Sequence, residues 1–526
     1  MDAVSDRERT YHWHGADDMS AYIAAALTCK LFYEPAMDCL WEILPSLTFL
    51  MTTLPRDAWS GTPKWYHDFV SDINAKVARG QTNRVNQVLL REPARDEWAR
   101  FFAHARRVRY LTLVDSAAES TSLPNTLRAI VNAVRSDKAP FPMLRHLDLS
   151  LEVHAEDLPY LTILFSLSPS LEEFTMTWRD TPLKETLLAS LIGMRPAISS
   201  LKLFSWHPSS PEDSLIMKFT KLRKFSVSQS LRADTLYRLS SFDTLQVLDV
   251  NFSGSQSLSY HIDDIIRPHD AFPNLTDLKL GLVEDADTIV PFLSRMSCHR
   301  LRRLELAFLQ SDRVISGKFN RILETIARFP ALSRLSLRQT SGEPDDLPSN
   351  STCSIRPLFR LRHLERLSVR STLLRSSFTD DAIAEFGRAW PRLVTLSYER
   401  SFQDDGVRPL PTLRVLPLCA THLPNLRWLA LELDAIEVPA PLPAPLSQTP
   451  TTMVLDDSVV DYEDFARIAE YIASVYPRAD VLVNAAPEET VDTMFWTNVG
   501  SVVPVIGKLR EENRRLKAAL GEEKEI

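Results

Sequence analysis

Five arginines recur at equivalent places in successive copies of a short apolar pattern. They are Arg303, Arg334, Arg338, Arg366 and Arg370. A guanidinium group is a planar fork of N–H donors that fits a carboxylate or a phosphate, and clusters of arginine often bind such groups. The arrangement predicts a surface that binds an acidic or phosphorylated segment of a target protein, with Trp428 as a candidate aromatic anchor. The alternative is a solvated face whose arginines pair locally with Glu305, Glu365 and Glu399.

Two histidines near the N-terminus, in Tyr11-His-Trp-His14, could ligate a metal ion together with Asp17 and Asp18. No further Cys or His stands at a zinc-like spacing, so a polar terminus with chance histidines is the favoured interpretation. We therefore predict no metal site and no cofactor.

Glycine is scarce, and this bears on catalysis. Only 13 of the 526 residues are glycine, whereas about 7% is usual. Phosphate-binding loops and nucleophile elbows need glycine for close backbone approach and positive φ. The chain contains no G-x-G-x-x-G, G-x-x-x-x-G-K-[ST], G-x-S-x-G or H-E-x-x-H motif. We do not expect it to be an enzyme.

The arginines lie within a repeated unit, apolar-x-x-apolar-x-apolar, of which Leu144-Arg-His-Leu-Asp-Leu149 is typical. Further strict copies start at Leu275, Leu301, Leu332 and Leu426, and looser copies at Val108, Leu171, Ile198, Leu222, Leu245, Leu364 and Leu393. Such a unit, recurring every two to three dozen residues, is typical of leucine-rich repeats, in which each copy contributes one strand and a return segment.

The residues between the copies predict helices. Between two copies, Leu183, Leu187, Leu188 and Leu191 follow the i, i+4, i+5, i+8 spacing of an amphipathic helix. Proline breaks a helix and lacks the N–H that a strand interior needs, so a proline two residues before a copy marks the corner between helix and strand. Such prolines are Pro142, Pro169, Pro196, Pro273, Pro330, Pro391 and Pro424. We predict an α/β leucine-rich-repeat solenoid, an arc or horseshoe, over residues 108–484.

Alternation along each strand assigns the side chains to two faces. The second and third apolar residues of a copy point into the core, and the residues around them face the concave surface. Neighbouring strands lie about 4.8 Å apart, which should place Arg334 beside Arg366 and Arg338 beside Arg370. Glu432 is expected on the same surface.

Charge and cysteine usage indicate the cellular setting. The net charge of -8, from 60 basic and 68 acidic residues, implies no general affinity for nucleic acid or anionic membranes. Five widely spaced cysteines argue against a disulfide framework. The sequence shows no signal peptide and no apolar run long enough to span a bilayer. We expect a soluble intracellular protein of the cytoplasm or nucleus.

Residues 18–54 predict a small helical module. Ala-rich helix formers run to Leu27, and apolar residues continue on both sides of Pro35, so two short helices are expected. This hairpin carries more apolar bulk than it can bury alone. It therefore needs a partner or the end of the solenoid.

The hairpin resembles the second half of an F-box. Leu27-Thr-Cys29-Lys-Leu-Phe32 and Pro35-Ala-Met-Asp-Cys-Leu40-Trp41 are similar to Leu-Val-Cys-Arg-x-Phe followed by Pro-Ala-Leu-Asp-x-Leu-Trp. Together with the repeats and the segment from Asp96 to Leu111, they resemble the large fungal set of F-box and leucine-rich-repeat proteins. The resemblance implies a substrate-recognition subunit of an SCF-type ubiquitin ligase. In that family the F-box binds the Skp1-type adaptor of the cullin complex, and the repeats hold the target. The adaptor-binding residues implied are Leu27, Cys29, Phe32, Pro35, Leu40 and Trp41.

The first F-box helix normally opens with Leu-Pro-x-Glu, and residues 1–17, predicted to be a disordered terminus, contain nothing of that kind. Either the coding sequence begins further upstream, or the box is degenerate and binds the adaptor weakly. Two alternatives remain. Residues 27–41 could serve only as a cap of the solenoid, and the chain could be a non-catalytic interaction scaffold independent of ubiquitin ligation.

Three further segments complete the predicted organisation. Residues 55–107 are predicted to be a connector that packs on the first repeat. The proline-rich stretch from Val438 to Pro450 favours polyproline II, either as an inter-repeat connector or as an SH3-type ligand. Residues 485–526 form a C-terminal tail with a short helix.

That tail carries a two-heptad seam made of Ile506, Leu509, Asn513, Leu516 and Leu520. Asn at an a position favours a parallel register, so residues 506–520 predict a weak homodimer. An isolated helix of about 12 to 15 residues is marginal, so a solvated tail is the alternative.

Overall fold

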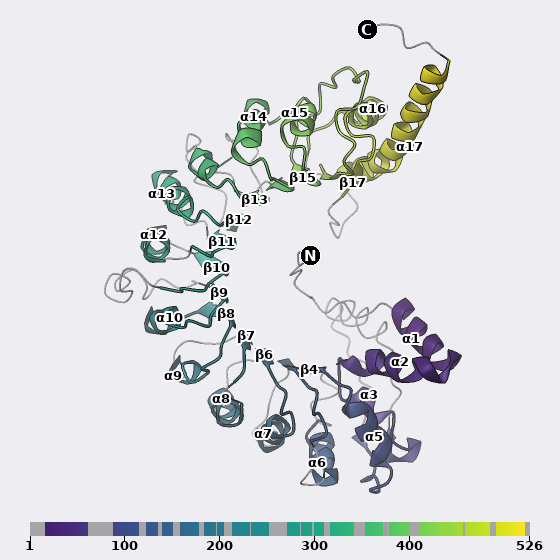
Figure 1. The fold of residues 1–526 in the computed structure, drawn as a ribbon, viewed down its shortest axis with the longest axis vertical. Coiled ribbons are helices and arrows are strands. Elements are labelled where there is room, and N and C mark those ends of the chain that lie inside the picture. The colour runs from purple at the N-terminus through teal and green to yellow at the C-terminus, as the bar shows by residue number, and fades with distance from the viewer. Residues whose placement is uncertain are drawn as a thin grey trace. The chain divides into compact units, whose positions relative to one another are not determined.

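The computed structural model describes residues 16–60, 88–114, 123–134, 139–150, 158–177, 183–195, 197–204, 213–231, 233–251, 271–283, 286–296, 299–309, 316–340, 353–371, 374, 378–399, 410–455, 458–483 and 491–520. Contacts divide the chain into two compact units, Met1–Gln229 and Ser230–Ile526. Along the repeats of each unit, strands alternate with helices or shorter connections, and the helices between the strands lie on one side of them (Figure 1).

The first unit begins with helices and continues as strand repeats. Its described helices are α1 (Ala16–Thr28), α2 (Lys30–Glu42), α3 (Thr48–Met51), α5 (Trp98–Ala105), α6 (Leu123–Ala133), α7 (Leu158–Ser166), α8 (Leu183–Met194) and α9 (Asp213–Ile216). Its parallel strands are β1 (Ile43–Leu44), β4 (Tyr110–Val114), β5 (His146–Ser150), β6 (Glu173–Thr177), β7 (Ser200–Phe204) and β8 (Lys224–Ser230). A short antiparallel pair, β2 (Trp59–Ser60) and β3 (Val88–Leu89), stands apart from them.

The second unit contains the longer run of repeats. Its described strands are β9 (Val247–Asn251), β10 (Asp277–Val283), β11 (Arg303–Leu309), β12 (Arg334–Thr340), β13 (Arg366–Arg370), β14 (Thr395–Glu399), β15 (Trp428–Leu431), β16 (Thr452–Val454) and β17 (Asp480–Leu482). Its described α-helices are α10 (Ala233–Ser240), α12 (Ala286–Arg295), α13 (Ser316–Ile326), α14 (Asp380–Ala389), α15 (Val415–His422), α16 (Phe465–Val475) and α17 (Val491–Ala519).

The apolar positions of the repeat pattern lie in register from strand to strand. Leu304 of β11 is paired with Leu335 of β12, and Leu335 with Leu367 of β13. All three side chains are buried, as alternation along the strands requires. Among the described residues, six strands of the first unit and nine of the second are parallel neighbours of this kind. The prediction of an α/β leucine-rich-repeat solenoid is confirmed.

Helices close the other side of the core. In α13 the side chains of Ile322, Leu323 and Ile326 are fully buried, and each burial contributes about 1.5–3 kcal/mol. The predicted corner prolines lie in turns just before their strands, except Pro196, which is outside the described residues. Because proline cannot extend the helix, the chain turns there and the next strand begins.

The N-terminal helices are arranged differently from the expectation. The break between them falls at Cys29, whereas Pro35 lies inside α2. A proline removes the hydrogen bond to the carbonyl group four residues earlier, here that of Leu31. Leu31 is 79% exposed, so water can satisfy that carbonyl oxygen. The helix therefore continues through the proline.

The chain leaves α2 directly into the first strand of the repeats. Ile43 of β1 is paired with Tyr110 of β4, and Leu44 with Leu111. The sequence pattern placed the first strand at Val108 and missed β1, because residues 43–44 are too few to show an alternation. Helix α2 thus leads directly into the sheet of the repeats, and residues 45–109 separate β1 from its neighbour β4 along the chain.

The C-terminal helix is much longer than the heptad seam indicated. Helix α17 spans 29 residues. Trp496, Val499 and Val503 in its first half are fully buried, and it packs on α16 and β17 (Figure 1). The seam is therefore the second half of a helix whose first half is anchored.

The proline-rich segment is fixed by backbone hydrogen bonds to this end of the second unit. The Leu442 N–H donates to Ser474 Oγ at 3.0 Å, and the Ser447 N–H donates to the Val475 carbonyl oxygen at 3.2 Å. These bonds support the interpretation as a connector between repeats. Within the part of the chain that the structure describes, every helix is too short or too polar to cross a lipid bilayer.

Candidate functional site

The five predicted arginines lie on three neighbouring strands of the second unit. Arg303 of β11, Arg334 of β12 and Arg366 of β13 are register partners. Four residues further along the same two strands, Arg338 is paired with Arg370. With strands about 4.8 Å apart, these positions form a compact grid on the face opposite the helices. We call these five residues the arginine face.

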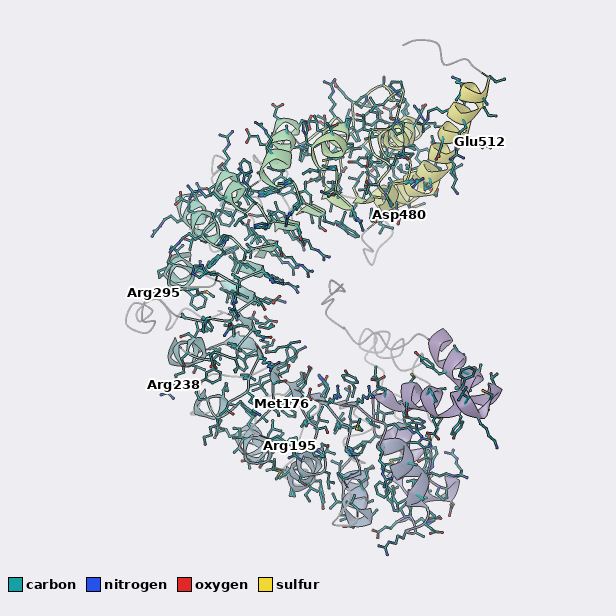
Figure 2. All side chains as sticks on the ribbon, in the orientation of Figure 1. Met176, Arg195, Arg238, Arg295, Asp480 and Glu512 are labelled. Carbon is teal, nitrogen blue, oxygen red and sulfur yellow. The ribbon has the colours of Figure 1, made fainter. Side chains whose placement is uncertain are left out.

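The side chains of the arginine face are accessible to solvent. Arg338 and Arg366 are exposed, and Arg303, Arg334 and Arg370 are partly exposed. Figure 2 shows long side chains extending from these strands on the side away from the helices. A ligand could therefore reach the guanidinium groups without displacing any described backbone.

Local carboxylates neutralise one edge of this face. Glu305 lies 3.9 Å from Arg303 and 3.8 Å from Lys279, which also approaches Asp249 at 4.0 Å. For Arg334 and Arg338 no ion pair or side-chain hydrogen bond is found among the described residues. The interpretation as a locally paired face thus applies to Arg303 and Glu305, and Arg366 and Arg370 also have interaction partners. Within the described residues it does not account for Arg334 and Arg338.

Small hydroxyl side chains stand between the two arginine rows. Ser336 of β12 is paired with Ser368 of β13. A hydroxyl group can donate a hydrogen bond to an anion held by the flanking guanidinium groups. The grid therefore offers both charge and hydrogen-bond donors to a carboxylate or phosphate.

Trp428 lies in the same row as Arg366, with Thr395 of β14 between them. Its side chain is 38% exposed, which suits an anchor that contacts an apolar group of a ligand. The expectation for Glu432 was wrong. Glu432 is buried at 3% exposure and follows the end of β15, so strand alternation no longer assigns its direction.

A second polar pair on the strand face lies in the first unit and was missed in the sequence. His146 Nδ1 of β5 lies 3.2 Å from Glu173 Oε2 of β6. This hydrogen bond is the main reason why the pKa of Glu173 is lowered, and Lys224 and Lys202 act in the same direction. Both residues occupy the second position after the first leucine of their repeats. Aligning the repeats could therefore have found the pair.

The residues implied by the F-box resemblance fall into two groups. Leu27 and Phe32 are 81% and 52% exposed, and Leu31 between them is equally accessible. Cys29 and Pro35 are also on the surface. We call Leu27, Leu31 and Phe32 the N-terminal apolar patch. It is an unusual concentration of exposed large apolar side chains on two adjoining helices.

Leu40 and Trp41 form the second group and face inward. Leu40 is half-buried, and the Trp41 ring stacks on the ring of His104 in α5 at 4.4 Å between centroids. Burial, together with the charges of Arg107 and Arg100, lowers the pKa of His104. The imidazole is therefore neutral at physiological pH and packs as an apolar ring. Trp41 attaches α2 to the repeats rather than facing solvent.

Ion pairs complete this attachment. The Arg107 side chain donates to Glu34 and Asp38 of α2. Arg109 Nη1 donates to Glu42 Oε1 at 3.1 Å, and the Arg109 N–H donates to the Glu42 carbonyl oxygen at 2.9 Å. Helix α2 is thus held on one side, and the N-terminal apolar patch remains accessible on the other.

Metal-ligating side chains do not cluster within the described ranges. The histidines of Tyr11-His-Trp-His14 lie outside those residues. Of the cysteines, Cys29, Cys39, Cys353 and Cys419 are described, and these four form no disulfide bond.

Comparisons with known proteins gave matches among solved structures. No protein-family model matches the chain, and no curated protein matches it. Among solved structures, an internalin from Listeria monocytogenes is similar, with a TM-score of 0.32 and 13% identity. The match covers 69% of this chain and 90% of the internalin chain. The fold itself defines the class as a leucine-rich-repeat solenoid, a scaffold typically used for binding other proteins.

Proposed function

We propose that the chain is a non-catalytic target-recognition subunit of an SCF-type ubiquitin ligase that acts inside the cell. In this proposal the N-terminal apolar patch binds a Skp1-type adaptor, and the arginine face binds an acidic or phosphorylated segment of the target. The observation that carries it is the exposure of Leu27, Leu31 and Phe32 on helices that are otherwise well attached.

The apolar patch is large enough to drive association. Burying a leucine or phenylalanine side chain contributes about 1.5–3 kcal/mol. Three such side chains therefore offer roughly 5–9 kcal/mol, from which the cost of association is subtracted. A monomeric chain gains nothing from leaving these groups in water, so a partner of matching apolar surface explains their position.

The target side of the proposal rests on charge. The arginine face gathers five cations in a chain whose net charge is -8. Like charges held about 4.8 Å apart in neighbouring strands repel one another. A dianionic phosphate or a pair of carboxylates would relieve this repulsion and bind through two or more guanidinium groups.

Titration calorimetry with a purified Skp1-type adaptor tests the first part. The unmodified chain should bind, and Leu27→Asp/Phe32→Asp should lose binding because two charges would enter the apolar contact. Leu90→Asp is the matched control, since Leu90 is 62% exposed in the same unit but belongs to a different segment. Equal binding by all three proteins, or by none, would reject the adaptor role.

Binding to an array of paired phosphorylated and unphosphorylated acidic peptides tests the second part. Arg338→Glu/Arg370→Glu should weaken capture by about a hundredfold or more, because two charge-assisted hydrogen bonds of about 1.5–3 kcal/mol each are lost. Arg388→Glu/Arg392→Glu makes the same change in charge at exposed positions outside the strands and should leave capture intact. Equal losses in both variants would indicate a general charge effect and reject the site.

A second candidate function is an interaction scaffold independent of ubiquitin ligation. Two features favour it. Trp41 packs on His104, and β1, which directly follows α2, is paired with β4 and so joins α2 to the edge of the sheet. Both features suit a cap of the repeats. Under this alternative the adaptor does not bind, whereas capture of acidic peptides by the arginine face persists.

A further inference from the structure

The second half of α17 presents an apolar stripe to solvent. Leu509, Leu516 and Leu520 are 60%, 59% and 72% exposed. Asn513, between them, is exposed, and Ile506 at the start of the stripe is half-buried. These residues follow the three-four spacing of a coiled-coil seam, with Ile506, Asn513 and Leu520 at a positions and the two other leucines at d positions.

The stripe lies on a different side of α17 from the one that packs on the second unit. The packed side is defined by Val499, Val503 and Gly507, which are buried. Arg510 marks the same side, because its Nη1 donates to Glu470 Oε1 at 3.1 Å and its Nη2 to the Leu442 carbonyl oxygen. At about 100° per residue, the centre of the stripe lies roughly 100° around the helix from this side, and Ile506 lies at the boundary between the two. Packing against the unit therefore leaves Leu509, Leu516 and Leu520 of the stripe exposed.

The charges beside the stripe match a parallel partner with the same sequence. Glu512 occupies a g position, and Lys517 occupies the e position five residues later; both are exposed. In a parallel pair each g residue meets the following e residue of the other helix, so Glu512 of each copy faces Lys517 of the second copy. Figure 2 labels Glu512 on this part of α17.

An antiparallel pair would be unfavourable, because it sets e residues opposite e residues. In that orientation Lys517 would no longer meet Glu512 of the second copy, and Arg510, the other e residue, is already bound to Glu470. The charges therefore select the parallel orientation. Asn513 at the central a position favours the same two-stranded register.

We propose that α17 binds α17 of a second copy of this chain, as a parallel two-stranded coiled coil over residues 506–520. A free peptide of this length would be a marginal helix. Here Trp496, Val499 and Val503 fix the preceding turns, so the cost of ordering the helix is already met before the partners associate. The inference is independent of the proposed ligase function.

Sedimentation equilibrium of the full chain tests the proposal. The unmodified protein should show a concentration-dependent mass that approaches twice 59.7 kDa. Leu509→Asp/Leu516→Asp should raise the dimer dissociation constant more than a hundredfold, because four charges would enter a two-heptad seam. Met494→Asp is the matched control: Met494 is 57% exposed on the same helix but outside the seam, and this variant should still dimerise.

Charge exchange tests the orientation. Glu512→Lys and Lys517→Glu should each weaken the dimer about fivefold, and the double variant should restore it, because the two pairs are re-formed with opposite polarity. Circular dichroism should show unchanged helix content in every variant. A monomer at all concentrations, a dimer unaffected by Leu509→Asp/Leu516→Asp, or no recovery in the double variant would overturn the proposal.

Discussion

Two glycines of α17 lie directly against backbone carbonyl groups of the preceding repeat, and replacing them should loosen the helix. A Cβ atom at Gly500 would lie 2.3 Å from the Val481 carbonyl oxygen, and one at Gly507 would lie 2.2 Å from the Pro477 carbonyl oxygen. Ordinary contact begins at about 3.4 Å. Because the neighbour is backbone, it cannot rotate away, and α17 must shift by about 1 Å.

The size of the effect follows from two opposing contributions. Alanine is more favourable than glycine in a helix by about 1 kcal/mol, whereas overpacking of this kind costs about 1–3 kcal/mol. Gly193 in α8 provides the reference, since a Cβ atom there meets nothing within 4 Å. Gly193→Ala should stabilise its helix by about 1 kcal/mol. The change in helix stability caused by Gly500→Ala should therefore be less favourable than that caused by Gly193→Ala, by about 1–3 kcal/mol.

Hydrogen exchange of individual peptides is the suitable assay, because repeat proteins open in segments and a single melting temperature averages over them. For Gly500→Ala, protection of residues 491–519 should fall by up to about thirtyfold, which corresponds to about 2 kcal/mol. For Gly193→Ala, protection of α8 should rise. If protection rose equally in both variants, the close packing of α17 on the Val481 carbonyl group would be refuted.

Two ion pairs of the first unit give further predictions. Arg107→Ala should weaken the attachment of α2 by only about 1 kcal/mol, since the carboxylates that Arg107 contacts are largely solvated. Hydrogen exchange of residues 30–42 should become faster in this variant. Unchanged exchange would contradict the role of this contact. Arg91 donates to Glu97 at 2.7 and 2.8 Å, and this bond lowers the pKa of Glu97 from 4.5 to about 2. A lowered carboxyl pKa stabilises the fold above pH 4.5 and loses this effect as the pH falls towards 2. Arg91→Ala should therefore lower the protection of residues 91–105 against hydrogen exchange at pH 6, and the difference in protection from the unmodified protein should shrink below about pH 4.5. A difference independent of pH would argue against this pair.

Most of the repeat architecture could be predicted because strand alternation and helix periodicity are local. Leu304, Leu335 and Leu367 hold equivalent places in their copies, and the same places make them register partners in the sheet. The arginine grid follows from the same alignment. Once the copies are aligned, the neighbours of Arg334 and Arg338 are determined by the constant spacing between strands.

Features that depend on tertiary contacts were harder to predict. Strand β1 is too short to show a period, and it forms because β4 offers a paired edge. The inward position of Trp41 depends on His104, which lies 63 residues later in the chain (104 minus 41). Helix α17 is long because Trp496 anchors its first half. The heptad pattern of residues 506–520 carries no information about that contact.

The most direct test of the account is quantitative mass spectrometry of proteins that copurify with the chain from cells. The account holds that two separate surfaces bind two different partners. It predicts that Leu27→Asp/Phe32→Asp loses the Skp1-type adaptor and keeps the target, whereas Arg338→Glu/Arg370→Glu loses the target and keeps the adaptor. If the adaptor were absent from the unmodified sample, or if neither pair of substitutions changed the set of copurified proteins, the account would be contradicted.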